Sequence, residues 1–275
     1  MQDNDYPIQV ALAGAAGKMG RAAAVAILGD PRFHLSAALV RQEPTDLNLP
    51  CPIYTDARAL LMEVRPQVWL DFTDVTSVVL HVDACLEFGV RPVVGATGYT
   101  HTDVEHWHKR CLETGLGGIV APNFAIGALM MIRFATEASR FFNHAEIIEL
   151  HHAGKKDAPS GTARRTAESM AKAREEPHPH EHALSHALGS QKESTHLEEN
   201  DSPARGLSVA GIPVHSVRLP GLLAHQEVLL GSQGETLTLR HDSYDRQSFM
   251  PGVLLALDKV GQMRGIVYGL EHLLW

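Results

Sequence analysis

The first 120 residues alternate short apolar runs with helical patterns, and this alternation admits few folds. Ile8–Ala13 and Phe33–Val40 read as strands, and Lys18–Leu28 between them reads as a helix of small residues. The alternation continues through further segments: Asp56–Val64, Val68–Phe72, Thr76–Phe88, Arg91–Val94, Thr102–Thr114 and Gly118–Val120. Because parallel strands need helical crossovers, the pattern predicts an α/β fold with a doubly wound parallel sheet.

The rhythm changes in the second half of the chain. Strand patterns with few helices between them predict a mixed sheet in a second domain: Ala145–Leu150, Leu207–Arg218, Leu222–Leu230 and Glu235–His241. The last segment, Gln247–Trp275, reads as helical, and we expect it to return to the first domain. The sequence therefore predicts one domain over residues 1–122 and 246–275 and another over 123–245.

Charge and cysteine usage exclude several classes of protein. The formal net charge of -8 argues against nucleic acid or an anionic membrane surface as a partner. Three cysteines without a C-x-x-C pair suit a reducing cytoplasm, where we expect the protein to act. The uncharged stretch 114–132 is interrupted at Gly117-Gly118 and Pro122-Asn123, so we expect no membrane span.

A polar stretch over residues 172–205 is rich in histidine, which raises the question of a metal site. Prolines and acidic residues surround the histidines, and no cysteine lies nearby. We favour a solvated loop and predict no metal.

A glycine-rich turn, Gly14-Ala-Ala-Gly-Lys-Met-Gly20, lies between the first strand and the first helix. This is the place of a dinucleotide-binding turn, in which the helix N-terminus offers N–H groups to a pyrophosphate. Gly17 allows close approach of the phosphates, and Gly20 allows the helix to pack closely on the strand. Glycine-rich turns also occur where a helix only packs closely on a strand. We favour nucleotide binding because this turn lies within a strand–helix–strand unit.

The second strand ends without the acidic residue that usually binds a ribose 2′-hydroxyl. Val40 stands at its end, and Arg41 follows. Since an arginine can pair with a 2′-phosphate, this favours NADPH over NADH, with NADH use still possible. A solvated surface arginine is the alternative.

Two later loops, Gly95-Ala-Thr-Gly-Tyr99 and Ala121-Pro-Asn-Phe124, follow strands of the same sheet. Open α/β sheets bind ligands at the carboxyl ends of their strands. We therefore expect cofactor contacts at all three places: Gly14, Ala15, Ala16, Gly17, Lys18, Met19, Arg41, Gly95, Ala96, Thr97, Ala121, Pro122, Asn123 and Phe124.

One segment concentrates more candidate catalytic and anion-binding side chains than any other: Glu149-Leu-His-His-Ala-Gly-Lys-Lys-Asp-Ala-Pro-Ser-Gly-Thr-Ala163. Imidazoles exchange protons near neutral pH, ammonium groups pair with carboxylates, and a Ser-Gly-Thr helix start presents N–H groups to an anion. We expect one lysine to reach this site and the other to be solvated. Arg218, His225 and Arg246 are candidates for a second anion contact.

Together these motifs resemble the 4-hydroxy-tetrahydrodipicolinate (dihydrodipicolinate) reductases. The residues that carry the resemblance span most of the chain: Val10–Arg21, Asp71-Phe-Thr73, Gly95–Gly98, Ala121–Phe124 and Glu149–Ala163. The resemblance implies a Rossmann-like dinucleotide-binding domain, a mixed substrate-binding and tetramerisation domain, and a homotetramer. It also implies NAD(P)H-dependent reduction of a cyclic dicarboxylate in lysine and diaminopimelate synthesis.

The resemblance also implies roles for single residues. His151 corresponds to the general acid/base and Lys155 to the proton donor and carboxylate partner. His152, Gly161 and Thr162 correspond to substrate-binding positions, and Lys156 to a variable one. Two other functions remain open from the residues alone: a different NAD(P)-dependent oxidoreductase of a small amino or keto acid, and a non-catalytic NAD(P)H sensor.

Overall fold

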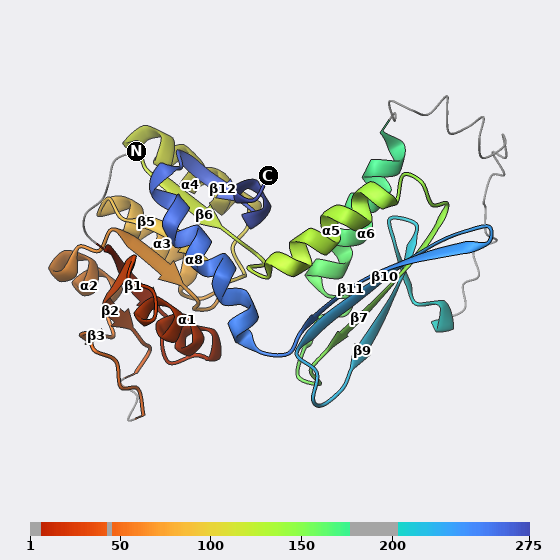
Figure 1. Cartoon of the computed structure of the whole chain (residues 1–275). Helices are drawn as coiled ribbons and strands as arrows, with labels where there is room; N and C mark the ends of the chain where they lie inside the picture. Colours follow the sequence, from red (N-terminus) through yellow and green to blue (C-terminus); the bar gives the residue numbers. More distant parts are fainter. Residues whose placement is uncertain (1–6, 43–45, 177–202) are drawn as a thin grey trace. The chain divides into compact units, whose positions relative to one another are not determined.

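Residues 7–42, 46–176 and 203–275 are described by the computed structural model of the chain (Figure 1). Within them the chain forms two units, Met1–Ile126 with Arg246–Trp275, and Gly127–Asp245. Most of the His-rich stretch lies at 177–202, outside the described residues.

A parallel sheet in the order β12-β6-β5-β4-β1-β2-β3 forms the centre of the first unit. Its strands are β1 (Ile8–Ala13), β2 (Phe33–Leu39), β3 (Ile53–Tyr54), β4 (Val68–Asp71), β5 (Arg91–Val94), β6 (Gly117–Val120) and β12 (Gly265–Tyr268). The central strands read as continuous apolar runs because helices cover both of their faces. All residues of β4 and β6 are buried, and so are three of the four residues of β5.

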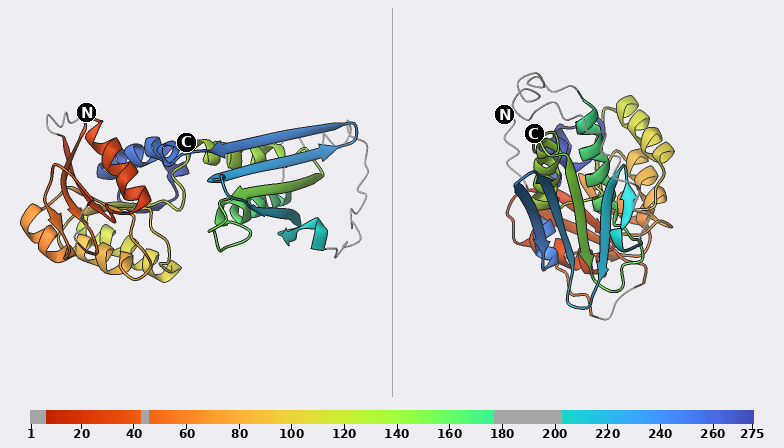
Figure 2. Two further views of the ribbon diagram at one scale, coloured as in Figure 1. Left: turned by 90° about the horizontal axis from the view of Figure 1, so that it is seen from below. Right: turned by 90° about the vertical axis from the view of Figure 1, so that its right-hand side faces the viewer.

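The helices of this unit are α1 (Lys18–Leu28), α2 (Ala57–Val64), α3 (Val78–Glu87), α4 (His101–Thr114) and α8 (Met250–Lys259), with short 3-10 turns at Arg246–Phe249, Val260–Gln262 and Leu270–Leu273. On one face α2, α3 and α4 pack around the buried indoles of Trp69 and Trp107. On the other face α1 lies beside α8 (Figure 2). The predicted doubly wound sheet is confirmed.

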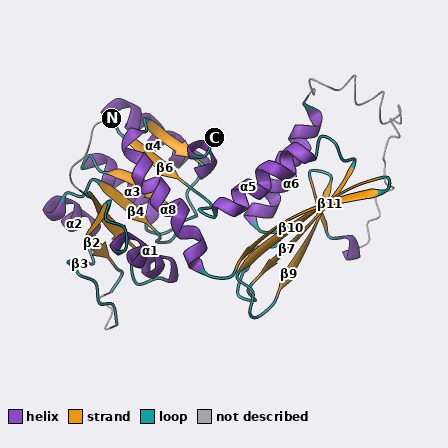
Figure 3. Cartoon of the chain, in the orientation of Figure 1, coloured by secondary structure: helices purple, strands orange, loops and turns teal. Residues whose placement is uncertain are grey.

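The second unit is built on a mixed sheet in the order β11-β10-β7-β9-β8. Its elements are α5 (Ile126–Ala138), β7 (His144–His151), α6 (Gly161–Glu175), a 3-10 turn at Pro203–Arg205, β8 (Leu207–Val209), β9 (Ile212–Arg218), β10 (Ala224–Ser232) and β11 (Glu235–Ser243). Only β7 and β9 pair in parallel, and the other neighbours are antiparallel. Helices α5 and α6 cover one face of the sheet (Figure 3).

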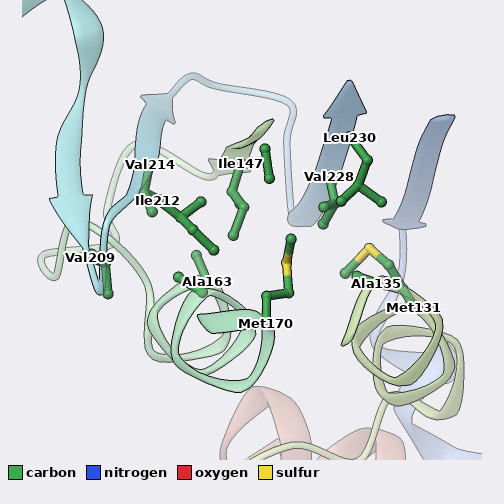
Figure 4. Close-up of a cluster of buried hydrophobic side chains, with 12 residues drawn as sticks. Met131, Ala135, Ile147, Ala163, Met170, Val209, Ile212, Val214, Val228 and Leu230 are labelled. Carbon is green, nitrogen blue, oxygen red and sulfur yellow. The ribbon is translucent and has the colours of Figure 1, made fainter. Parts of the chain in front are cut away.

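Apolar side chains between these helices and the sheet form the core of the second unit (Figure 4). Met170 of α6 is fully buried against Ile147 of β7 and Val228 of β10. Alternate residues of β7 point to this core, so Ala145, Ile147 and Glu149 share one face of the strand. The same alternation thus places the side chain of Glu149 at the buried end of the sheet.

Three sequence predictions are wrong in detail. The strand expected over Leu207–Arg218 is a hairpin of β8 and β9, because Ala210 and Gly211 both adopt positive φ (48° and 78°), as a two-residue hairpin turn requires. The helical segment expected over Gln247–Trp275 contains β12, which pairs with β6 at the sheet edge. The polar loop expected from residue 172 begins later, because α6 continues to Glu175.

Among the described residues, no helix is long and apolar enough to cross a membrane.

Candidate active site

Close packing requires two of the three glycines in the turn from β1 into α1, Gly14 and Gly20. A Cβ on Gly20 would lie 2.1 Å from the carbonyl oxygen of Gly14, so only glycine lets the helix approach the strand this closely. Gly14 itself has a φ of 77° and lies against the carbonyl of Phe72. Gly17 is the N-cap of α1 and is exposed, without a side-chain cap or an acidic residue in the first turn. Because no side chain caps the N-terminus of α1, its N–H groups are open to an anion.

Loops after β4, β5 and β6 lie beside one another at the carboxyl edge of the sheet. The N–H groups of Gly95 and Ala96 donate to the carbonyl oxygen of Asp71, at 2.8 and 3.1 Å. The rings of Phe72 and Phe124 meet edge to face at 5.8 Å, and a Cβ on Gly95 would collide with both. The structure thus brings together the predicted loops at 95–97 and 121–124.

Not every predicted cofactor residue offers a side chain at this edge. Ala15, Ala96, Ala121 and Phe124 are almost fully buried, whereas these residues are exposed: Ala16, Gly17, Lys18, Thr97 and Pro122. The side-chain oxygen of Asn123 accepts a hydrogen bond from the N–H of Ala125 at 2.8 Å, and this contact fixes the turn that leads into α5.

Asp71, at the end of β4, is a fully buried carboxylate that fixes the loop after it. It accepts hydrogen bonds from the indole of Trp69, from the N–H and hydroxyl of Thr73, and from Nδ1 of His81 at 2.9 Å. Burial raises the pKa of Asp71, but the hydrogen bonds from His81, Thr73 and Trp69 outweigh it and hold the pKa below its usual value. The charged carboxylate therefore anchors Thr73 at the sheet edge.

Arg41 follows β2 and is largely exposed, with its guanidinium 2.5 Å from the carboxylate of Asp74. An exposed ion pair of this kind contributes little to stability. The guanidinium is therefore held near the sheet edge by a contact that a stronger anion can replace.

In the second unit, His151 is the last residue of β7, and its Nδ1 lies 2.5 Å from Oε2 of Glu149. The carboxylate of Glu149 is fully buried and receives both terminal nitrogens of Arg218, at 2.8 and 2.9 Å. Its Oε1 also accepts from the N–H of Ser160 at 3.1 Å. One carboxylate thus joins β7, β9 and the start of α6.

Burial raises the pKa of Glu149, but hydrogen bonds from His151, Arg218 and Ser216 outweigh it and lower the pKa to about 2. The carboxylate is therefore ionised at neutral pH and only accepts hydrogen bonds. Nδ1 of His151 must then carry the proton of that bond, which leaves Nε2 to take up or release a proton.

The loop between β7 and α6 presents the remaining predicted residues. Nζ of Lys155 pairs with Asp157 at 2.9 Å and is half-buried, whereas Lys156 and His152 are exposed. Burial raises the pKa of Asp157, but the hydrogen bond and charge of Lys155 lower it overall. The two lysines thus differ in their surroundings: Asp157 holds Lys155 in the loop, and Lys156 extends into solvent.

Helix α6 begins at Gly161, after the N-cap Ser160, whose hydroxyl accepts from the N–H of Ala163. Helix geometry leaves the N–H groups of Gly161 and Thr162 without a partner inside the helix. A Cβ on Gly161 would meet no described atom within 4 Å, so the fold does not require glycine there. Gly161 and Thr162 can therefore present their N–H groups to an anion.

The second anion contacts expected at Arg218 and His225 are already bound to carboxylates of the chain. Arg218 pairs with Glu149, and Nδ1 of His225 lies 2.7 Å from Asp242. Arg246 belongs to a 3-10 turn of the first unit. Within the described residues, no three His, Cys, Asp or Glu side chains are grouped to hold a metal ion.

Sequence reasoning missed the part played by Glu149 and Asp71. Each is an acidic residue inside an apolar strand, two residues from a residue that it binds: His151 for Glu149 and Thr73 for Asp71. A buried carboxylate needs hydrogen-bond partners, so an acid within an apolar strand is itself the signal of such a network.

Comparisons with known proteins show which family the chain belongs to. Residues 8–124 match the family described as dihydrodipicolinate reductase, N-terminus, and residues 127–274 match dihydrodipicolinate reductase, C-terminus. The chain is 44% identical over 278 residues to the 4-hydroxy-tetrahydrodipicolinate reductase of Geobacillus kaustophilus, covering 97% of this chain and 99% of that one. It is 46% identical to that of Lactococcus lactis subsp. cremoris, with 97% of both chains covered.

A solved structure is also similar: the dipicolinate-bound dihydrodipicolinate reductase from Paenisporosarcina sp. TG-14. It has a TM-score of 0.79 and 41% identity, with 97% of this chain and 99% of that chain covered. The amine dehydrogenase of Mycobacterium smegmatis, at 12% identity and a TM-score of 0.60, shares the fold alone. The resemblance drawn from the sequence motifs is thus confirmed, and the chain belongs to the 4-hydroxy-tetrahydrodipicolinate (dihydrodipicolinate) reductase family.

Proposed function

We propose that the chain reduces 4-hydroxy-tetrahydrodipicolinate to tetrahydrodipicolinate with NAD(P)H, in lysine and diaminopimelate biosynthesis. The observation that carries this proposal is the pairing of His151 with ionised Glu149 beside the open N-terminus of α6. A proton donor and an anion-binding helix start are what a cyclic dicarboxylate substrate requires. Relatives that match 97% of the chain bear the name of this activity, and one was solved with dipicolinate bound.

The substrate carboxylates are assigned to the second unit. The N–H groups of Gly161 and Thr162, with the Thr162 hydroxyl, take one carboxylate at the start of α6. Lys155 supplies a cation, and its pair with Asp157 is partly exposed, so exchange of partners costs little. His152 adds a donor from the exposed loop. Two anchored carboxylates fix the orientation of the ring, which is a large part of the rate gain.

Proton transfer is assigned to His151 and Lys155. The substrate loses its 4-hydroxyl as water and gains a hydride and a proton in net reaction, so the chain must supply an acid. With Nδ1 held by Glu149, Nε2 of His151 is the nitrogen that exchanges this proton. Lys155 is the second proton donor, from the loop that follows His151.

The residues of the first unit fit a dinucleotide. The packing of Gly20 on Gly14 brings the N-terminus of α1 to the end of β1, where exposed Gly17 and Lys18 leave room for a pyrophosphate. The loops at Gly95–Thr97 and Ala121–Phe124 lie at the same edge and are assigned to the nicotinamide half. The hydride for the reduction comes from the nicotinamide of NAD(P)H when that cofactor is bound. We assign the first unit to cofactor binding and the second to substrate binding.

NADPH is the preferred cofactor in this proposal. Val40 offers no acceptor to a ribose 2′-hydroxyl, and the exposed guanidinium of Arg41 is within reach of the edge through its contact with Asp74. A 2′-phosphate carries more charge than a carboxylate and offers Arg41 a bidentate partner. Exchange of Asp74 for the phosphate therefore favours NADPH, with NADH used less well.

A homotetramer assembled through the second unit completes the proposal. The face of its sheet away from α5 and α6 carries half-buried apolar side chains from three neighbouring strands: Ile148, Leu150, Val217 and Leu229. Such a face is suited to packing against another copy. Analytical ultracentrifugation measures the assembly, and a monomer at micromolar concentration would contradict this part of the proposal.

A coupled assay tests the function directly. Dihydrodipicolinate synthase generates the unstable substrate in the cuvette, and oxidation of NADPH and NADH is followed separately. We expect substrate-dependent oxidation with both cofactors and a lower KM for NADPH. No oxidation with either cofactor, by protein that still binds NADPH, would refute the proposed reaction.

A further inference from the structure

The buried carboxylate of Glu149 touches both halves of the proposed substrate site. Its Oε2 accepts from Nδ1 of His151, and its Oε1 accepts from the N–H of Ser160, the residue that caps α6. The neighbouring residues Gly161 and Thr162 are the proposed carboxylate anchor. A single side chain therefore connects the proposed acid with the proposed anion site.

Arg218 keeps this carboxylate charged and in place. Its terminal nitrogens form a two-point ion pair with Glu149, and Nη2 also donates to the carbonyl oxygen of Asp157. The fork geometry fixes the plane of the carboxylate, so the direction of each lone pair is set. The opposite residue on β10, Gln226, is neutral and directs its amide to Thr166. Within the described part of the chain, the charged groups facing Glu149 are thus Arg218 and, when protonated, His151.

An ionised carboxylate at Nδ1 has two effects on an imidazole. It selects the tautomer with the proton on Nδ1, and it fixes the orientation of the ring. A general acid needs both, because Nε2 must be the nitrogen that exchanges the proton and must point to the reacting atom. The ring of His151 is largely buried, with 14% of its side chain exposed, so solvent screens this interaction weakly.

We propose that Glu149 is a positioning residue for the reaction, holding His151 with Nε2 as its proton-exchanging nitrogen and fixing the start of α6 relative to that ring. This inference rests on the proposed function. A purely structural ion pair between Glu149 and Arg218 is the alternative, and it predicts loss of stability without any change in the proton chemistry.

The chain offers a matched control on the same strand. Glu146 also binds a histidine and an arginine, with His215 at 2.8 Å and Arg205 at 2.5 Å. It lies three residues before Glu149 on β7 and therefore points to the opposite face of the sheet. Glu146→Gln removes the same kind of charge network away from the proposed site.

The kinetic test compares Glu149→Gln, Glu146→Gln, His151→Gln and the double variant of Glu149 and His151. For Glu149→Gln we expect kcat to fall about 10- to 100-fold, less than for loss of the acid itself. The double variant should match His151→Gln within about twofold, since Glu149 acts through His151. Glu146→Gln should retain the wild-type kcat.

Two kinetic outcomes overturn the inference: wild-type kcat in Glu149→Gln, or independent effects that multiply in the double variant. Circular dichroism and NADPH binding show that each variant is folded. If the wild-type protein shows no reductase activity, the proposed function fails instead, so the two failures are distinct.

Removal of the charge leaves Arg218 without its partner, which can unfold the second unit. A second measurement on the wild-type protein avoids this. Nitrogen-15 NMR of histidine-labelled protein, with the His151 signals assigned by their absence in His151→Gln, reports the tautomer. We expect the neutral ring to carry its proton on Nδ1, and a proton on Nε2 instead would overturn the inference.

Discussion

In the β1–α1 turn, Gly20 allows the helix to pack on the strand, whereas Gly17 leaves room for the pyrophosphate. Alanine substitutions at the two positions should therefore have different effects. At Gly20, a Cβ lies 2.1 Å from the carbonyl oxygen of Gly14, whereas ordinary contact begins at 3.4 Å. Helix α1 must move by roughly 1.3 Å to admit the methyl group, and the obstacle is backbone that has no rotamer to change. Overpacking of this kind costs about 3 kcal/mol, and the better helix propensity of alanine returns about 1 kcal/mol.

The expected net loss for Gly20→Ala is therefore about 2 kcal/mol. For a unit of this size, that loss lowers Tm by roughly 4–8 °C. At Gly17 the nearest atom to an added Cβ is 3.2 Å away, and the residue is exposed with an ordinary extended backbone. Gly17→Ala should cost less than about 1 kcal/mol, the usual price of a poorer N-cap. Its methyl group, however, stands where the pyrophosphate should pass, so KM for NADPH should rise about tenfold or more.

Thermal unfolding by circular dichroism and steady-state kinetics with NADPH distinguish the two variants. Each variant is the control for the other, because both add one methyl group to the same turn. The reasoning is refuted if Gly20→Ala melts with the wild-type protein, or if Gly17→Ala binds NADPH unchanged. Equal losses of stability in both would also contradict it.

Four further predictions address the two units. His151→Gln should lower kcat roughly 10²–10⁴-fold with little change in Tm, and full turnover in the coupled assay would exclude it as the acid. Arg41→Ala should raise KM for NADPH far more than for NADH, so equal effects would rule out a 2′-phosphate contact. Gly161→Ala should raise KM for the substrate without loss of Tm, because its Cβ has space; an unchanged KM contradicts the carboxylate anchor. Finally, folding lowers the pKa of Glu149 from its usual 4.5 to about 2, which adds about 3 kcal/mol to the free energy of unfolding at neutral pH. This contribution is present above pH 4.5 and is lost as the pH falls toward 2. The free energy of unfolding in urea should therefore fall more steeply with acid in the wild-type protein than in Glu149→Gln, and parallel curves would contradict this prediction.

Local sequence signals predicted most of the first unit. The turn at Gly14–Gly20 and the apolar runs of β1, β4 and β5 lie where the sequence places them, because each is decided by neighbours within one strand–helix unit. The four residues of β12 carry no period that separates strand from helix. Pairing with β6, far away in the sequence, makes them a strand.

The proposed site shows the same division between local and distant causes. The Glu149–Ala163 segment stands out in the sequence because its histidines, lysines and helix start lie within fifteen residues, whereas the choice of Lys155 over Lys156 comes from the family resemblance. The ion pair between Glu149 and Arg218 joins residues 69 positions apart, and Arg218 alone reads as a free anion contact. Only the pairing of β7 with β9 brings the two charges together and turns an expected ligand contact into an internal bond.

The position of β12 has a consequence for synthesis on the ribosome. Strand β6 leaves the ribosome 145 residues before Gly265, the first residue of its partner strand. At translation rates of 5–20 residues per second, the outer edge of β6 stays unpaired for roughly 7–30 s before β12 is synthesised. An uncovered apolar strand edge is a template for pairing with another chain. Nascent chains of this protein are therefore exposed to aggregation at β6 until the final strand emerges, and early release of the chain leaves that edge open.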